Sequence, residues 1–148
     1  MRALAFLHGR WVGTATTYQS DGSTVTSLSM DVITPLMDGE LLAIAGSSYA
    51  PGATLDDAPV MQNYGILHFD DRHATLALTS FAMGSQLRGE GRIVAAGHAE
   101  WLMPSPVGTL RFTVTAQGGD GWHELIAVAQ DDGKNWRPYV EIAFRRLP

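Results

Sequence analysis

The sequence predicts an all-β protein, an antiparallel up-and-down barrel of about ten strands preceded by a short helix. Turn-forming stretches such as "SDGS" at 20–23 and "DDGKN" at 131–135 recur at short, regular intervals. The segments between them are rich in Val, Ile, Thr, Phe and Tyr, which are the residues that favour strands. None of these segments shows a sustained period of 3.6 residues, so long helices are not expected.

The elements follow one another closely along the chain. A short helix is expected at 2–8. The predicted strands span residues 10–18, 24–34, 40–49, 60–69, 73–82, 86–94, 97–103, 107–116, 122–130 and 135–146. The period of two is clearest in "TLRFTVTA" at 109–116, where apolar and polar residues alternate over the whole stretch. Such alternation is typical of a half-buried strand.

The connections are too short for crossover helices, so sequential strands should pair in an antiparallel meander. An open meander of this size has bare edges, and closure into a barrel removes them. A barrel of about ten strands is wide enough to enclose a small ligand. The long connection "APGATLDDAP" at 50–59 either covers a mouth of the barrel or is an idle surface loop.

Length and composition narrow the class of protein. The 148 residues fit one domain, 1–148, and the formal net charge is −5. The sequence has no basic stripe, so nucleic acid is not an expected partner. The chain has no Cys and no apolar run long enough for a membrane helix, and its first residues lack the pattern of a signal peptide. We therefore expect a cytoplasmic protein that does not bind membranes.

The first and last strands carry a paired signature. The stretch "GRW" places Gly9 and Trp11 on the first strand, and "FRR" places Arg145 and Arg146 at the end of the chain. A Gly-x-Trp near the start with an Arg on the last strand resembles the calycin superfamily, which includes lipocalins and fatty-acid-binding proteins. The resemblance implies that Trp11 plugs one end of a barrel while an Arg packs across its ring.

The alternation of side chains along the last strand indicates which of the two Arg residues packs against Trp11. Val140, Ile142 and Phe144 form an apolar face, so Arg146 points inward with them and Trp11 and Arg146 close the barrel. If the register is reversed, Arg145 takes this place and the opposite face of 135–146 lines the cavity. More closely, "LHGRWVG", "LMDGELL", "YGILHFDD" and "DDGKNWRPYVEIAFRR" are similar to bacterial lipocalin-like domains of unknown function, of the type called DUF1579. This resemblance is specific for fold and hardly specific for function.

The strand at 60–69 carries two candidate ligand-binding residues. In "NYGILHFDD", Tyr64 and His68 share one face, whereas Asn63 and Leu67 share the other. If the first face is inside, a Tyr hydroxyl and an imidazole enter the cavity. The alternative is that His68 lies near the rim and makes one hydrogen bond.

Two further candidates lie later in the chain. In "GWHELIAV", Glu124 shares a face with Ile126 and Val128, so its carboxyl enters the interior or forms a salt bridge at the rim. A buried carboxyl has a raised pKa and can serve as a base. Trp101 is expected to line the cavity or to belong to ordinary core packing.

These residues predict a barrel that binds a small hydrophobic or aromatic molecule, with Tyr64, His68, Trp101 and Glu124 as lining. The alternative is an enzyme of the isomerase or cyclase type that acts on a hydrophobic metabolite in the same cavity, with His68 or Glu124 as weak catalytic candidates. No cofactor and no metal site are expected. A haem barrel such as nitrobindin, a relative by fold, places a proximal His near the end of the chain, but no His follows His123 here. The oligomeric state stays open, with a homodimer among the alternatives.

Overall fold

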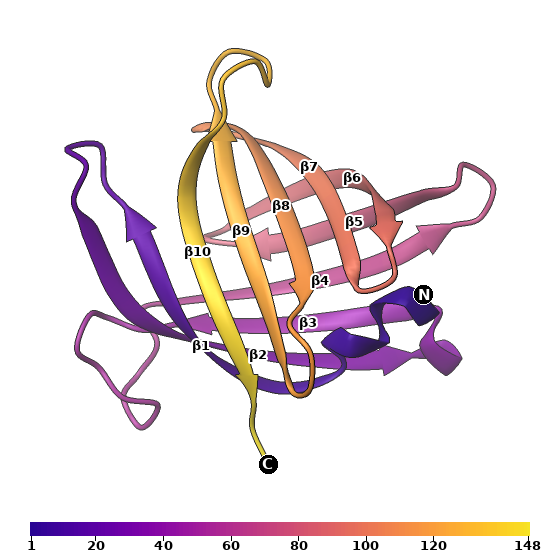
Figure 1. Ribbon diagram of the computed structural model, residues 1–148, viewed down its shortest axis with the longest axis horizontal. Coiled ribbons are helices and arrows are strands. Elements are labelled where there is room, and N and C mark those ends of the chain that lie inside the picture. Colours follow the sequence, from indigo (N-terminus) through magenta and orange to yellow (C-terminus); the bar gives the residue numbers. More distant parts are fainter.

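Ten antiparallel strands close into a barrel in the computed structural model, which describes residues 1–148 (Figure 1). The strands are β1 (Gly9–Tyr18), β2 (Thr24–Leu36), β3 (Leu41–Ser48), β4 (Met61–Asp70), β5 (Thr75–Ala82), β6 (Ser85–Ala95), β7 (His98–Ser105), β8 (Gly108–Ala116), β9 (Gly121–Ala129) and β10 (Arg137–Arg146). Each strand pairs with its neighbours in sequence, and β1 pairs with β10 to complete the circle. The predicted fold is confirmed, and every predicted strand is present.

Two short 3-10 helices accompany the strands. The helix η1 (Arg2–Leu7) corresponds to the predicted N-terminal helix, and its Leu4 and Leu7 are buried in the core. The helix η2 (Met37–Gly39) forms the turn between β2 and β3. Neither has the length and apolar character that a membrane-crossing helix needs.

The barrel has two unlike ends. At the end that holds η1 and both chain termini, Leu42, Leu67 and Leu76 fill the interior with exposures of 0%, whereas Phe69 and Ile93 are partly buried. These three leucines lie on the neighbouring strands β3, β4 and β5, where Leu42 pairs with Leu67 and Leu76 pairs with Phe69. The opposite end is formed by the other set of turns, which includes the long connection between β3 and β4 and the hairpin between β9 and β10 (Figure 1). We call these the closed end and the open end.

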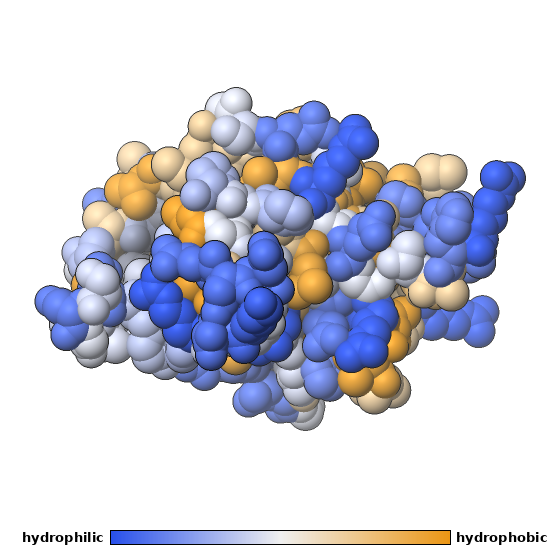
Figure 2. Space-filling view, turned by 90° about the horizontal axis from the view of Figure 1, so that it is seen from above, coloured by the Kyte–Doolittle hydropathy of each residue, from blue (hydrophilic) through white to orange (hydrophobic).

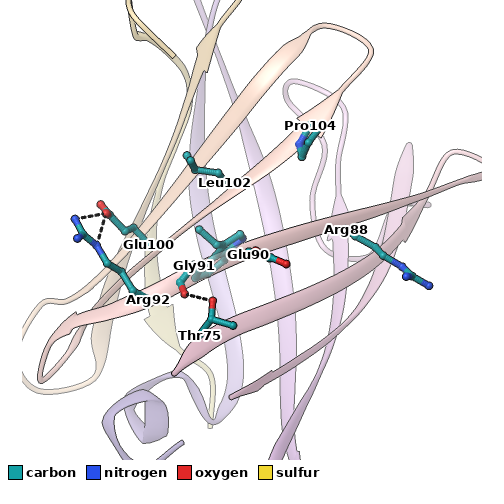
Figure 3. A pocket seen from close by; sticks show the side chains of 9 residues that line it. Thr75, Arg88, Glu90, Gly91, Arg92, Glu100, Leu102 and Pro104 are labelled. Carbon is teal, nitrogen blue, oxygen red and sulfur yellow. Dashed lines mark hydrogen bonds and ion pairs between the residues drawn. The ribbon is translucent and has the colours of Figure 1, made fainter. Parts of the chain in front are cut away.

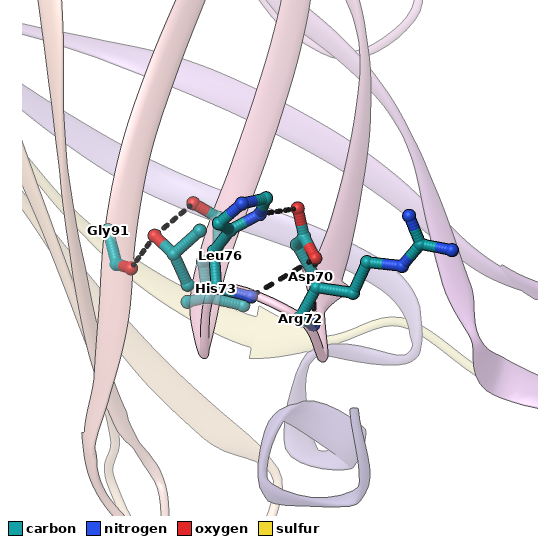
Figure 4. Close-up of polar contacts among 6 residues, drawn as sticks. Asp70, Arg72, His73, Leu76 and Gly91 are labelled. Carbon is teal, nitrogen blue, oxygen red and sulfur yellow. Dashed lines mark hydrogen bonds and ion pairs between the residues drawn. The ribbon is translucent and has the colours of Figure 1, made fainter.

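The β4–β5 turn at the closed end is fixed by one carboxylate. Asp70 accepts hydrogen bonds from the backbone N–H groups of Arg72 and His73, and its other oxygen lies 2.7 Å from Nδ1 of His73 (Figure 4). These bonds lower the pKa of Asp70, the bond with the His73 ring most of all. The His73 side chain is 73% exposed, so this cluster belongs to the turn and faces solvent.

Candidate binding site in the barrel interior

Trp11 and Arg146 close one end of the barrel as predicted. Trp11 is 1% exposed, its indole N–H donates to the Leu7 carbonyl at 2.7 Å, and the Arg146 guanidinium lies 4.1 Å from its ring centre. Nη1 of Arg146 donates to the carbonyl of His8, and Nε donates to Asp120. The guanidinium therefore ties the last strand to the N-terminal helix across the plug.

The glycines on either side of Trp11 make room for its neighbours. A Cβ at Gly9, where φ is +129°, would overlap the Arg146 guanidinium. A Cβ at Gly13 would overlap the side chains of Ile142 and Phe144. The alternation of Gly, Trp and Gly in "GRWVG" thus lets an Arg and a Phe pack against the inner face of β1.

Aromatic rings continue from the plug into the interior. Trp122 meets Trp11 edge to face, with ring centres 6.1 Å apart, and stacks on Phe144 at 4.0 Å. Trp101 stacks on Phe112, with ring centres 5.7 Å apart. Since β7 to β10 contribute four of these rings, one side of the barrel presents aromatic and aliphatic surface.

The opposite side, formed by β2, β3 and β4, is more polar. The strand β2 turns Ser27, Ser29 and Asp31 inward with Val25 and Ile33. Asp31 pairs with Gly46 on β3, which in turn pairs with Asn63 on β4. A Cβ at Gly46 would overlap the Asn63 amide, so this glycine lets the amide lie across the wall beside Asp31. The interior therefore has an apolar side and a polar side.

The inner face carries four charged positions. Following the strand registers around the barrel from Trp11, these are Asp31, Glu124 and Arg146, together with the exposed Arg137 at the open rim, which pairs with Val128. Arg146 is held at the closed end by Trp11, Asp120 and the His8 carbonyl. The two carboxyl groups form no ion pair.

Burial strongly perturbs both carboxyl groups. Desolvation raises the pKa of Asp31 to about 7. Desolvation, and then the charge of Asp31, raises the pKa of Glu124 to about 8. No hydrogen bond to either carboxylate offsets this cost. Both groups therefore titrate near neutral pH, where a carboxyl can give or take a proton.

Solvent reaches the interior from the open end. Phe112, Ile126 and Val140 point into a closed barrel, yet each remains only half-buried, as does Glu124. At the closed end Leu42, Leu67 and Leu76 are fully buried by contrast. An inner side chain of a closed barrel is accessible only where the lumen is not filled. Val128 and Met103 in the open half are 2% exposed, so the unfilled space is confined to the surroundings of Phe112, Ile126 and Val140.

Two hollows lie outside the lumen. One, of about 710 Å³, crosses the outer wall of β5, β6 and β7, where Arg92 and Glu100 pair at 2.8 Å and Arg88 and Leu102 lie nearby (Figure 3). A second, of about 450 Å³, borders the β5–β6 turn. Viewed from above, the surface shows hydrophobic residues in separate patches among hydrophilic ones (Figure 2).

The structure places the predicted site residues on two faces. Trp101, 5% exposed, and Glu124 point into the barrel as expected. Tyr64 and His68 point outward, and Tyr64 is 46% exposed. The expectation that these two line the cavity, and with it the catalytic candidacy of His68, is corrected. The reason is register: Leu67 pairs with the buried Leu42 and Leu78, which fixes the other face of β4 inside.

Sequence reasoning missed Asp31 and Asn63. On β2, the apolar Leu28, Met30 and Val32 alternate with Ser29 and Asp31, so hydrophobic patterning assigns the wrong face to the core. The orientation of β2 follows from its pairing with β1. Because Trp11 points inward, its cross-strand partner Asp31 must also point inward.

A polar cluster on the outer wall is separate from the interior. Glu141 accepts a hydrogen bond from the Tyr18 hydroxyl at 2.7 Å and contacts Nε2 of His123 at 2.7 Å. Both hydrogen bonds lower the pKa of Glu141, and the bond from Tyr18 has the larger effect. The structure gathers no group of three or more His, Asp or Glu side chains that could hold a metal ion.

Comparison with known proteins shows the fold. The crystal structure of Rv2717c from M. tuberculosis is similar with a TM-score of 0.73 and 16% identity, covering 100% of this chain and 99% of that chain. The S-type phycobiliprotein lyase CPES from Guillardia theta is similar with a TM-score of 0.69 and 10% identity, covering 97% of this chain and 89% of that chain. The chain thus has a lipocalin-like, ten-stranded barrel fold.

No family model and no curated protein matches the sequence. The finer resemblance to DUF1579-type domains is therefore not confirmed.

Proposed function

We propose that this protein binds a small, mainly apolar or aromatic molecule inside the open half of the barrel. The observation that carries the proposal is that inner side chains of a closed barrel stay accessible there, beside two carboxyl groups without protein partners. Ligand sites are typically apolar cavities with a few convergent polar groups that fix orientation. The assignment to DUF1579-type domains is part of this proposal.

The two sides of the lumen suit such a ligand. The side formed by β7 to β10 offers aromatic rings and aliphatic chains, whose contact with an apolar ligand removes surface from water. The side formed by β2 to β4 offers Asp31, Asn63 and serine hydroxyls. A ligand with an apolar body and one polar group would match both sides.

The test uses N-phenyl-1-naphthylamine, a neutral apolar reporter whose fluorescence rises on transfer from water. We expect binding at micromolar strength, roughly −8 kcal/mol. Ile126→Trp, which fills the open half of the lumen, should weaken binding at least about tenfold, since overpacking removes the space that the ligand needs. Leu102→Trp on the outer hollow and Tyr64→Phe on the outer wall are the matched controls and should change little.

An absence of binding, or binding weakened by Leu102→Trp and untouched by Ile126→Trp, would contradict an interior site. Native mass spectrometry of freshly purified protein gives a second readout, because it weighs any molecule that co-purifies.

A second candidate function is catalysis in the same lumen, and the raised pKa of Glu124 favours it. A carboxyl that titrates near pH 8 can act as general acid or base on a bound substrate. One structural neighbour is titled a lyase, so a barrel of this architecture can serve an enzyme. A co-purified ligand should then be converted by the wild type, and Glu124→Gln should lower the rate about 100-fold or more.

A further inference from the structure

We infer that the barrel selects apolar or aromatic ligands that carry a positively charged nitrogen group, which Asp31 and Glu124 receive inside the lumen. This inference rests on the proposed interior site and names the chemical class of its ligand. It separates this barrel from one built to hold an anion such as a fatty-acid carboxylate.

The first supporting observation is the unpaired charge of the inner face. Its charged side chains are Asp31, Glu124 and Arg146, with the exposed Arg137 at the open rim. The Arg146 guanidinium is engaged by the Trp11 ring, Asp120 and the His8 carbonyl at the closed end. Arg137 is exposed and forms no ion pair with either carboxylate. Charges that are largely removed from water are ordinarily paired, so two unpaired carboxylates on an inner wall point to a cation from outside.

The second observation is an aromatic surface next to Glu124. Trp122 lies two residues away on the same inner face of β9, and Phe112 and Trp101 form a stacked pair on the next two strands. The faces of aromatic rings attract cations, most strongly when the cation is desolvated. Aromatic rings and carboxylates therefore favour the same kind of ligand group.

The third observation is an unsatisfied buried donor on the same inner face as Glu124. The indole N–H of Trp122, a residue 3% exposed whose side chain points into the barrel, has no acceptor in the protein, and the same holds for Trp101 at 5%. A buried N–H without a partner is costly and rare in native proteins. A donor needs an acceptor, so these two N–H groups indicate a ligand that carries a hydrogen-bond acceptor in addition to its cationic group.

Coupling between the two carboxyl groups supports one shared site. The charge of Asp31 raises the pKa of Glu124, so the two groups lie close enough to repel each other when both are ionised. A cation between or beside them would relieve this repulsion, whereas an anion would add to it.

The experiment compares three probes that share a naphthylmethyl group and differ in charge. They are (2-naphthylmethyl)trimethylammonium, its neutral carbon analogue 2-neopentylnaphthalene, and the anion 2-naphthylacetate. Affinities are measured by fluorescence titration at pH 9, where both carboxyl groups are ionised. We expect the cation to bind about tenfold or more tightly than the neutral analogue, and the anion to bind most weakly.

The variants are Asp31→Asn and Glu124→Gln, with Glu90→Gln as the matched control. Glu90 is an exposed strand residue that lines the outer hollow, so its replacement removes the same charge from the other side of the wall. We expect each inner variant to reduce the preference for the cation over the neutral analogue by about threefold or more, and the control to leave it unchanged. Circular dichroism establishes that each variant is folded. If one inner variant does not fold, the other carries the test.

The outcomes separate this inference from the proposed function. Equal binding of the neutral and cationic probes, or preference for the anion, overturns the inference while the interior site stands. A preference that Glu90→Gln abolishes, or that neither inner variant reduces, overturns it by placing the cation elsewhere. Failure of all three probes to bind overturns both the inference and the proposed function.

Discussion

The Arg146 guanidinium lies 4.1 Å from the centre of the Trp11 ring, and the two residues are direct cross-strand partners on β1 and β10. This contact joins the first strand to the last, at the seam where the barrel closes. The indole N–H of Trp11 also donates a hydrogen bond to the Leu7 carbonyl, so Trp11 anchors the N-terminal helix as well. The seam and the plug are therefore one structural unit.

Trp11→Ala should destabilise the protein by ~3–5 kcal/mol, because it leaves a large cavity in a fully packed layer. The midpoint of denaturant unfolding measures the change. Trp136→Ala is the control, since Trp136 lies in the β9–β10 loop, half-buried beneath Arg111. A Trp11→Ala midpoint no lower than that of Trp136→Ala would show that Trp11 is not a core plug.

Arg146→Ala should cost ~1 kcal/mol, from the loss of the stacked cation and its hydrogen bonds at a partly exposed position. Arg145→Ala should cost less, within about 0.5 kcal/mol, because Arg145 points outward and has no side-chain partner in the protein. Unfolding of the two variants under one set of conditions compares them directly. The reverse order would mean that the last strand is shifted by one residue.

Glu124→Gln should stabilise the protein, and the gain should grow between pH 5 and pH 8. The folded-state pKa of Glu124 is raised from 4.5 to about 8, so the unfolded chain releases this proton first as the pH rises. The wild type therefore loses stability across this range, by at most about 1.4 kcal/mol per pH unit for one group. The glutamine variant does not lose stability in this way. Thermal unfolding of both proteins at several pH values measures the difference in stability, and a difference that does not change with pH would contradict a desolvated, unpaired carboxyl at position 124.

Glu141→Gln should show the opposite dependence on pH. Hydrogen bonds from Tyr18 and His123 lower the folded-state pKa of Glu141, so its contribution to stability is present above pH 4.5 and is lost as the pH falls through the folded value. The variant should therefore be modestly less stable than the wild type at pH 7, and the difference should shrink toward pH 3. Equal stabilities at pH 7 would show that the outer cluster contributes nothing.

The fold could be predicted from the sequence because its determinants are local. Turn residues at regular intervals and period-two segments define strands, and short connections define their antiparallel order. The closure by Trp11 and Arg146 could be predicted as well, since Val140, Ile142 and Phe144 form an unbroken apolar face that fixes the parity of the last strand.

The site was harder to predict because the inner wall is not uniformly apolar. On β4 the inward set contains Asn63 and Gly65, and the outward set contains Tyr64 and Ile66, so hydrophobicity does not distinguish the faces. Where polar side chains also point inward, only the pairing with a neighbouring strand of known orientation shows which face of a strand lies inside. Glu124 was identified because its neighbours Ile126 and Val128 define the face on their own strand.

Affinity for (2-naphthylmethyl)trimethylammonium should rise with pH between about 6 and 9, if the inferred cation site is correct. The probe carries a fixed charge, so only the protein titrates. The acidic groups on the inner face are Asp31 and Glu124, and its cations are Arg146 at the closed end and Arg137 at the open rim.

Below pH 6 both carboxyl groups are largely protonated in the free protein, because their pKa values are raised to about 7 and about 8. Binding the cation must then expel protons, which weakens the apparent affinity by up to about tenfold per pH unit for each proton released. Above the higher pKa this cost disappears and the affinity reaches a plateau. Asp31→Asn should remove the lower part of the rise and Glu124→Gln the upper part, whereas the neutral analogue should bind with the same affinity at every pH. Fluorescence titrations across this range measure all four curves, and a flat profile for the cation with the wild type would show that neither carboxyl receives it.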